Sequence, residues 1–303
     1  METWTEIRSI NPFFYLGALG VYYLAFPVRA VRWRILLKNA GAERERIPRL
    51  TILAETISLS WFVNALTPAK LGDVYRGWLL RRTSGISWSL GMGTIVAERL
   101  LDVMVLVGLM ISSGMLAYQR LIVGEGPPPS QCLGGLPVDQ WGPTLARILI
   151  AGAVALGVLI FGLVLFARFG AHLEKWLPRR LGNVYLLFSE GLVLSFGRFG
   201  PLLLLSVATW AAEAGRFYFV GLALGHVLPL PLVFFFSLVS AFLTIIPVTP
   251  GGVGFEFLLA GTLCLLGYAP AEAWSLSLVD RSLSYLSLIV GGAAVYIWSP
   301  RTK

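Results

Sequence analysis

The chain has 303 residues, of which 56% are hydrophobic and 13% are charged, and its mean hydropathy is +0.76. Soluble domains carry about 25% charged residues, so the composition excludes a soluble protein and indicates an integral membrane protein. The net charge of +8 fits basic loops facing anionic lipid better than nucleic acid, which we do not expect as a partner. Two Cys and two His, widely separated, form neither a disulfide framework nor a ligand set, so we expect no metal and no cofactor.

The apolar runs predict an all-α, polytopic membrane protein with a single transmembrane domain over residues 1–303. In chain order, the predicted membrane segments are 11–28, 50–66, 91–118, 143–168, 201–224, 231–247, 252–267 and 275–298. Glu2 and Glu6 precede the first segment and arginines follow it, the reverse of a cleavable signal peptide, so we expect it to be retained. A Gly- and Pro-rich loop is predicted over 123–143 and an amphipathic surface helix over 170–199.

Three of these segments are too short to cross a membrane, which takes about 20 residues. Segments 50–66, 231–247 and 252–267 end at Thr-Pro or Gly-Gly, which interrupt a helix. Short interrupted helices are typical of re-entrant hairpins, in which protein or water covers the freed backbone groups. We therefore predict two re-entrant helical hairpins.

The loop charges predict the orientation. Eighteen of the 24 Lys and Arg residues fall in the stretches 29–49, 69–82, 168–198 and 301–303, which the positive-inside rule assigns to the cytoplasm. The protein is then a multi-pass protein of the cell membrane, with its N-terminus outside and its C-terminus cytoplasmic. The first hairpin enters from the cytoplasmic face and the second from the outer face, so the repeat is inverted, as in secondary transporters.

A sequence repeat connects the two hairpins. The string Thr67-Pro68-x-x-Leu71-Gly72-Asp73 recurs as Thr249-Pro250-x-x-Val253-Gly254-x-Glu256. Downstream, Glu98-Arg99 and Asp280-Arg281 are separated by the same 182 residues as the two Thr-Pro pairs (280 − 98 and 249 − 67). The repeated elements cover about 50–118 and 231–298. Paired interrupted segments in two halves of a membrane protein point to a transport site.

Thr-Pro is typical of a helix start, with Thr as the N-cap and Pro at the first helical position. Each half-helix would direct free N–H groups and its positive dipole end at a shared space deep in the membrane. Lys70 lies in the first turn of the inner copy, with Asp73 and Arg76 just beyond, which suits a phosphate-bearing headgroup. Three glycines of the outer copy allow close backbone approach: Gly251, Gly252 and Gly254. The alternative is that Thr-Pro and Gly-Gly only break helices at loops.

Charged residues in the apolar segments cost roughly 2.5–3.5 kcal/mol each, so they tend to be functional. Asp102 lies on the Glu98 face at i+4, whereas the adjacent Arg99 points about 100° away. Acid and base must therefore find partners on different elements, and the same holds for Asp280 and Arg281. The alternative is a set of structural ion pairs that hold the helices together.

Further polar residues lie along the same segments. Glu213 and Arg216 are spaced i,i+3 and can neutralise each other, or contribute to a substrate path. Asn64 lies in the first hairpin and Glu256 in the second. The sequence does not distinguish which carboxylate would carry a coupling proton.

The strings NALTPAKLGDVYRGWLLRR, TIVAERLLDVMVL and IIPVTPGGVGFEFLLAGTLCLLGYAPAEAWSLSLVDRSLSYL resemble the flippase-like transmembrane region of lysylphosphatidylglycerol synthases, and the similarity covers roughly residues 10–300. The resemblance implies translocation of a charged or isoprenoid-linked phospholipid between leaflets. It implies family positions at Pro68, Gly72, Asp73, Arg76, Glu98, Arg99, Asp102, Pro250, Gly251, Gly252 and Gly254.

The chain departs from this family at two places. Pro68-Ala69-Lys70 stands where Gly or Pro-Gly is common, and Phe255-Glu256 shifts a common Glu by one residue. The aminoacyl-transferring domain of the synthases and the glycosyltransferase domain of some relatives are not in the sequence. We therefore do not assign the substrate from the family.

We predict a flippase-like lipid transporter rather than an enzyme. Its substrate would be an anionic phospholipid or a polyprenyl-phosphate lipid, and a second copy of the chain or a lipid-modifying enzyme are candidate partners. The predicted substrate-binding residues are Asn64, Thr67, Pro68, Lys70, Gly72, Asp73, Arg76, Glu98, Arg99, Asp102, Glu213, Arg216, Thr249, Pro250, Gly251, Gly252, Gly254, Glu256, Asp280 and Arg281, and no catalytic residue is predicted. The alternatives are an intramembrane enzyme that acts on lipid phosphates and a lipid-binding accessory protein.

Overall fold

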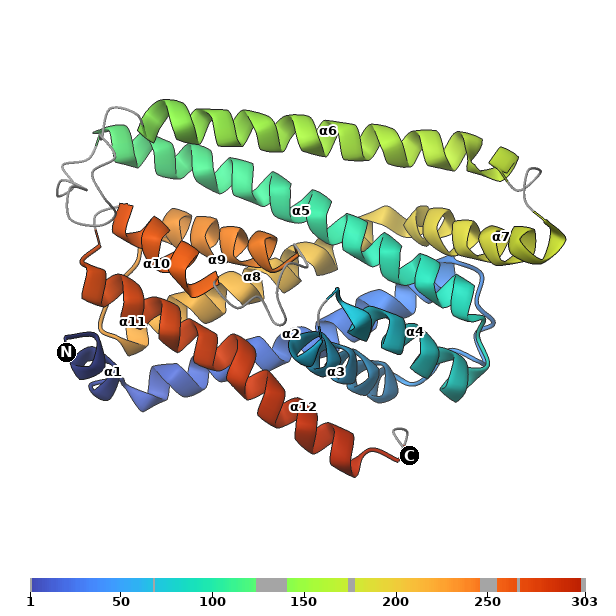
Figure 1. Ribbon diagram of the computed structural model, residues 1–303, viewed down its shortest axis with the longest axis horizontal. Coiled ribbons are helices and arrows are strands. Elements are labelled where there is room, and N and C mark those ends of the chain that lie inside the picture. The colour runs from blue at the N-terminus through green and yellow to red at the C-terminus, as the bar shows by residue number, and fades with distance from the viewer. Residues whose placement is uncertain are drawn as a thin grey trace. The chain divides into compact units, whose positions relative to one another are not determined.

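The computed structural model describes residues 2–67, 69–123, 141–173, 178–245, 255–265 and 268–300. Within these ranges every regular element is a helix (Figure 1), which confirms the predicted all-α class. The helices are α1 (Glu2–Arg8), α2 (Pro12–Asn39), α3 (Leu50–Leu66), α4 (Leu71–Ser84), α5 (Trp88–Val123), α6 (Trp141–Leu173), α7 (Arg179–Val193), α8 (Phe199–Ala223), α9 (Leu230–Ile245), α10 (Phe255–Leu265), α11 (Pro270–Arg281) and α12 (Ser287–Trp298). A 3₁₀ turn, Leu194–Arg198, joins α7 to α8, and a π turn, Ser282–Leu286, joins α11 to α12.

Local sequence sets several helix ends. Asn11 accepts the N–H of Phe13 on its Oδ1 at 3.0 Å, so an Asn cap followed by Pro12 starts α2. At the other end of a helix, α4 stops at Gly85, whose φ of 69° is in the left-handed region that favours glycine. Capping therefore fixes where these helices begin and end.

Four helical stretches in the described part of the chain are long and apolar enough to cross a membrane. They are Pro12–Asn39, Ile150–Gly170, Leu181–Ala223 and Pro270–Trp298. These stretches agree with the predicted class of integral membrane protein. By contrast, α3 has 17 residues and α4 has 14, fewer than the ~20 that a crossing takes.

Two regions differ from the predicted elements. Helix α2 continues through Pro27 to Asn39, although the predicted segment ends at 28. A proline inside a membrane helix is tolerated when neighbouring groups satisfy the freed carbonyl. The predicted amphipathic helix over 170–199 is found as α7, but it is shorter than predicted: α6 extends to Leu173, and a 3₁₀ turn follows α7 and leads into α8.

The chain divides into two compact units, and each is described by itself. Unit 1 holds Met1–Tyr23, Leu106–Ala155 and Trp210–Ser287. Unit 2 holds Leu24–Val105, Leu156–Thr209 and Leu288–Lys303. The hairpin helices of the two repeat copies therefore lie in different units, α3 and α4 in unit 2 and α9 and α10 in unit 1.

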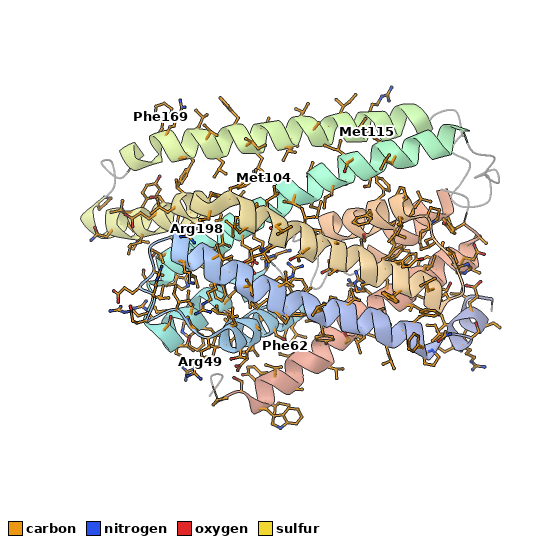
Figure 2. The ribbon with its side chains drawn as sticks, turned by 180° about the vertical axis from the view of Figure 1, so that it is seen from behind. Arg49, Phe62, Met104, Met115, Phe169 and Arg198 are labelled. Atoms are coloured by element: carbon orange, nitrogen blue, oxygen red, sulfur yellow. The ribbon has the colours of Figure 1, made fainter. Side chains whose placement is uncertain are left out.

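In unit 2, α3 and α4 form a tight helical hairpin. A Cβ on Gly72 would lie 1.9 Å from the carbonyl oxygen of Ser60, so only glycine lets these two backbones approach so closely. Helix α12 also packs closely on α3, because a Cβ on Gly292 would lie 2.5 Å from the Cβ of Phe62, which is labelled in Figure 2. Glycines thus allow close packing at both contacts of α3, with α4 at Gly72 and with α12 at Gly292.

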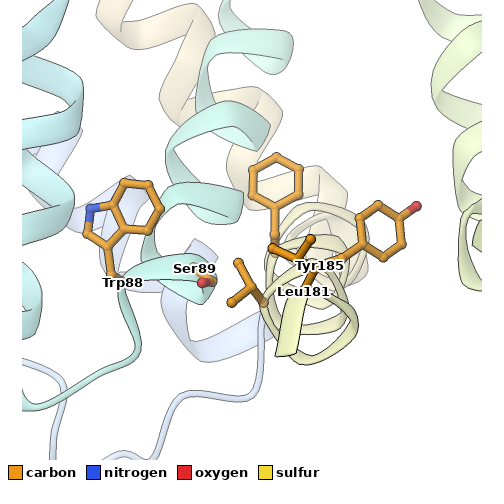
Figure 3. A pocket seen from close by; sticks show the side chains of 6 residues that line it. Trp88, Ser89, Leu181 and Tyr185 are labelled. Carbon is orange, nitrogen blue, oxygen red and sulfur yellow. The ribbon is translucent and has the colours of Figure 1, made fainter. Parts of the chain in front are cut away.

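Helices α5 and α7 also cross closely in unit 2. A Cβ on Gly93 would lie 2.3 Å from the carbonyl oxygen of Phe188. Toward the start of α5 there is an open crevice of about 310 Å³ (Figure 3). It is lined by Trp88, Ser89, Leu181, Val184, Tyr185 and Phe188. No charged side chain lines this crevice, so it is distinct from the charged residues described below.

In unit 1, the first part of α2 packs on the π turn that follows Asp280 and Arg281. The hydroxyls of Tyr15 and Ser282 lie 3.0 Å apart. The hydroxyls of Tyr22 and Tyr23 donate to the carbonyl oxygens of Ser284 and Ser287 at 3.1 and 2.9 Å. A π turn disturbs the regular backbone ladder and often marks a functional site; here three tyrosines supply the additional hydrogen bonds.

Candidate functional site

A buried ion cluster joins three helices of unit 2. Arg32 of α2 donates to Glu98 at 2.9 Å and to the two oxygens of Asp102 at 2.5 and 3.0 Å, both acids lying on α5. Arg76 of α4 donates to the other oxygen of Glu98 at 2.8 Å. Each of these four residues is at most 2% exposed, so the charges compensate one another without help from bulk water. The predicted shared face of Glu98 and Asp102 is confirmed.

Arg76 depends on Glu98 more than Arg32 does. The guanidinium of Arg76 lies over the ring of Trp33, 3.7 Å from the ring centre. Its Nε and Nη1 find no hydrogen-bond acceptor among the described residues. Arg32, in contrast, also donates to the hydroxyl of Ser206 at 2.8 Å. Within the residues that the structure describes, Glu98 is therefore the one carboxylate that holds Arg76.

Arg99 turns away from this cluster, as the helical angle between neighbours predicts. Its Nε and Nη2 donate to the two oxygens of Asp73 at 3.0 and 2.8 Å, a bidentate pair between α5 and α4. The side chain of Arg99 is 27% exposed and that of Asp73 is 13% exposed. This pair is accessible, whereas the cluster behind it is closed.

The turn between α3 and α4 presents Lys70 next to the Arg99–Asp73 pair. Lys70 is the N-cap residue of α4, with a φ of 55° and a half-buried side chain. Its ammonium makes neither a hydrogen bond nor an ion pair with any residue in the described ranges. Lys70 lies outside the four candidate spans, and the charges of Asp73 and Arg99 both act on its ammonium.

The predicted role of Thr67 as a helix N-cap is wrong. Thr67 ends α3 instead, because its N–H and its hydroxyl both donate to the carbonyl of Val63, at 2.9 and 2.7 Å. Its φ of −120° and ψ of 147° are the extended values that a residue before proline favours. Helix α4 begins at Leu71, and the Oδ1 of Asn64 accepts the N–H of Gly72 at 2.8 Å. Asn64 thus satisfies one of the amides that were expected to face a ligand.

Unit 1 contains a second set of ion pairs. Arg216 of α8 donates to Glu213 at 3.3 Å, which confirms the predicted i,i+3 pair, and it also donates to Asp280 of α11. All three side chains are buried. Arg281 pairs with Glu256 of α10, with 2.6 Å between Nε and Oε1. The acid and the base of the second dipeptide thus have different partners, as predicted.

The two units share one order of contacts. In each unit, the acid of the Glu-Arg or Asp-Arg dipeptide forms an ion pair with an arginine of the long helix before the hairpin, α2 or α8. The arginine of the dipeptide forms an ion pair with an acid of the second hairpin helix, α4 or α10. The pairs are Glu98 with Arg32 and Arg99 with Asp73 in unit 2, and Asp280 with Arg216 and Arg281 with Glu256 in unit 1. The similarity between the two halves therefore includes the preceding helix, which the sequence repeat did not reveal.

Arg29 and Arg32 are the residues that sequence reasoning missed. The charge count assigns both to a cytoplasmic loop, but both are buried in α2, and Arg29 Nη1 lies 3.9 Å from Asp102. Arg76 is also counted as a loop charge and is buried in α4. The orientation of the termini therefore stays a prediction that rests on the remaining charges. The i,i+3 spacing within the otherwise apolar stretch RAVRWRILL is the signal that would have placed both arginines on one helix face.

Part of the predicted site falls outside the described residues. These positions are Pro68, Thr249, Pro250, Gly251, Gly252 and Gly254. Helix α10 begins at Phe255, directly after the second of these segments. The described part of the predicted site comprises the turn between α3 and α4, apart from Pro68, and the ion pairs of each unit.

These features define an all-helical integral membrane protein with buried ion pairs in each of two units. Residues 1–292 match the family model described as the lysylphosphatidylglycerol synthase TM region. The chain belongs to this family.

Several relatives are similar over most of the chain. A UPF0104 membrane protein of Methanocaldococcus jannaschii is 32% identical over 237 residues, which cover 78% of this chain and 93% of the relative. A UPF0104 membrane protein of Pyrococcus horikoshii is 27% identical over 301 residues, covering 93% of this chain and 86% of the relative. The glycosyltransferase AglD of Haloferax volcanii is 25% identical over 318 residues, covering 96% of this chain and 50% of the relative. No solved structure matches the chain.

Proposed function

We propose that the protein is a flippase-like transporter that moves a lipid with an anionic headgroup between the two leaflets of the membrane. The lipid is an anionic phospholipid or an isoprenoid-phosphate-linked lipid. Lysylphosphatidylglycerol, in the family description, is a phospholipid, and one relative is named a glycosyltransferase. The family description favours a membrane lipid as the substrate class, and the relative's name makes lipids that carry sugars worth testing.

The observation that carries this proposal is the position of Lys70. Its ammonium lies beside the accessible Arg99–Asp73 pair, and the nearby carboxylate of Asp73 is already held by the guanidinium of Arg99. The neighbouring Arg76 and Arg99, in contrast, are each held by a carboxylate. A half-buried cation that shares its nearest carboxylate with an arginine is poorly compensated, so this turn favours an added anion. A lipid phosphate is such an anion, and its chains can stay in the bilayer.

A headgroup that crosses hydrocarbon must give up its water of hydration, which is the main barrier to its movement. Fixed charges and N–H groups can replace that water. In this proposal Lys70 and Arg99 contact the phosphate, and Asp73 holds Arg99 before the headgroup binds. The buried cluster around Glu98 holds α2, α4 and α5 in place so that these groups keep their positions.

We also assign α3–α4 and α9–α10 to re-entrant hairpins of an inverted repeat. Support comes from their lengths, since α9 has 16 residues and α10 has 11, and from the shared order of ion pairs. In a variant without the native cysteines, Arg49→Cys and Ala69→Cys report on the first hairpin. Labelling of Ala69→Cys by an impermeant maleimide from the face opposite to Arg49→Cys would show a spanning hairpin and contradict the assignment.

Lipid movement is measured in vesicles that contain the purified protein and a fluorescent lipid. The lipid is phosphatidylglycerol, an isoprenoid phosphate or, for comparison, the zwitterionic phosphatidylcholine. A reductant added outside bleaches only the outer leaflet, so transport appears as bleaching beyond half. Lys70→Gln should slow movement of the anionic lipids about 10- to 100-fold, the value of a charged hydrogen bond. Lys70→Arg should retain most of it.

Lys38→Gln is the matched control, because Lys38 is an exposed lysine in the last turn of α2. It should leave the rate unchanged. Equal bleaching with and without protein would contradict transport and favour a lipid-binding accessory role. An unchanged rate in Lys70→Gln would contradict the assignment of the site.

A further inference from the structure

We infer that the ligand at the α3–α4 turn is a lipid phosphomonoester, and that Asp73 competes with its headgroup for Arg99. A lipid phosphomonoester carries a terminal phosphate on an isoprenoid or a diacylglycerol, with three terminal oxygens. The inference rests on the proposed function and narrows it to one headgroup chemistry.

The first argument is the geometry of the Arg99–Asp73 pair. A carboxylate and a phosphate both offer two oxygens to the fork of a guanidinium, so each can take the same place on Arg99. Arg99 keeps part of its side chain exposed, whereas Arg32 and Arg76 are fully buried. Arg99 is therefore the arginine of this cluster that a headgroup can reach, and it is already matched to an oxyanion.

The second argument is that Asp73 is held mainly by Arg99. Its other side-chain contacts are long, 3.5 Å from the hydroxyl of Ser60 and 3.4 Å from the Nδ2 of Asn64. Hydrogen bonds at these distances are weak. Exchange of Asp73 for a phosphate therefore breaks one strong contact and leaves the hairpin contact at Gly72 intact.

The third argument concerns the number of charges. Arg99 and Lys70 are two cations beside Asp73. The nearest other carboxylate, Asp102, lies 3.9 Å from Arg99 and is already paired with Arg32 at 2.5 Å. A phosphomonoester carries a charge of about −1.5 to −2 at pH 7. Two of its oxygens can take the fork of Arg99 while the third accepts from Lys70. A phosphodiester, with one charge and two free oxygens, cannot satisfy both cations to the same extent.

Unit 1 provides the contrast. Arg281 and Glu256 form a similar, partly accessible pair. The sequence around that hairpin, residues 229–268, contains no Lys or Arg, so no second cation accompanies the pair from its own hairpin. The phosphomonoester site is accordingly assigned to unit 2, and Glu256→Gln is the matched control for Asp73→Asn.

The test is calorimetric titration of the purified full chain in micelles with three probes. The probes are inorganic phosphate, short-chain phosphatidic acid as the monoester and short-chain phosphatidylglycerol as the diester. Asp73→Asn removes the competing charge but keeps the side-chain shape, so phosphatidic acid should bind about tenfold tighter or more. Lys70→Gln, which leaves the Arg99–Asp73 pair intact, should weaken its binding about tenfold. Glu256→Gln should leave its binding unchanged.

Several results would overturn the inference. Phosphatidylglycerol that binds as tightly as phosphatidic acid would exclude the monoester preference. Inorganic phosphate that binds as tightly as phosphatidic acid would show a free-phosphate site. Unchanged or weaker binding in Asp73→Asn would exclude competition, and if this variant does not fold, unchanged binding in Lys70→Gln refutes the site. Tighter binding in Asp73→Asn without lipid movement in vesicles would support this inference while contradicting the proposed transport.

Discussion

Replacement of Glu98 by glutamine should destabilise unit 2 more than replacement of Arg32 by methionine. Glu98 accepts from both Arg32 and Arg76 in a fully buried site. Without its charge, Arg76 keeps no carboxylate contact among the residues described, and its Nε and Nη1 already lack acceptors there. Removal of Arg32 is different, because both acids retain a cation. Glu98 remains paired with Arg76, and Asp102 still lies 3.9 Å from Arg29 and from Arg99.

The size of the effect follows from burial. Removal of one partner of a buried ion pair costs about 3–5 kcal/mol, because the other charge is left uncompensated. We assign this full cost to Glu98→Gln and a value at or below its lower end to Arg32→Met. At about 2–4 °C per kcal/mol for a chain of moderate size, Glu98→Gln should lower Tm by roughly 6–20 °C.

Thermal unfolding of the purified protein in one detergent, followed by tryptophan fluorescence, measures both changes. Glu43→Gln is the control, because Glu43 forms an exposed pair with Arg46 and should change stability by less than about 1 kcal/mol. If Arg32→Met lowers Tm as much as Glu98→Gln, the claim that Arg76 depends on Glu98 is refuted. A negligible change in both would show that the cluster is not the main contact among α2, α4 and α5.

In unit 1 the order should reverse, and Arg216→Met should lower Tm more than Asp280→Asn. The first change leaves the buried carboxylate of Asp280 without its guanidinium, whereas the second leaves Arg216 paired with Glu213 at i,i+3. Equal shifts of Tm would contradict this order. Gly72→Ala should lower the free energy of unfolding by at least about 1–3 kcal/mol, because its Cβ would meet the carbonyl oxygen of Ser60. Gly108→Ala, with open space around it, should leave the stability unchanged, and an equally stable Gly72→Ala variant would show that the hairpin can open.

The sequence by itself determined the class of protein and the position of the charged site. Run lengths and composition are local properties, so they predict membrane helices, the short segments of the hairpins and the apolar setting of Glu98 and Asp280. The 100° step between adjacent helical residues correctly predicted separate partners for each acid and base. Thr67 was assigned wrongly because a Thr-Pro pair can end one helix as readily as it starts another. Its hydroxyl bonds back to Val63, and the choice depends on how the turn is closed.

Only the tertiary structure decided which charges meet. Arg32 lies 66 positions before Glu98 and 70 before Asp102, and the charge count had assigned it to a loop. Such pairs form because α2, α4 and α5 pack with particular faces together, and the rotation of a helix about its axis is set by all of its neighbours. The same packing leaves Lys70 beside an already matched pair of opposite charges. A sequence records that a lysine is present, but the distances between helices decide whether it has a counter-ion.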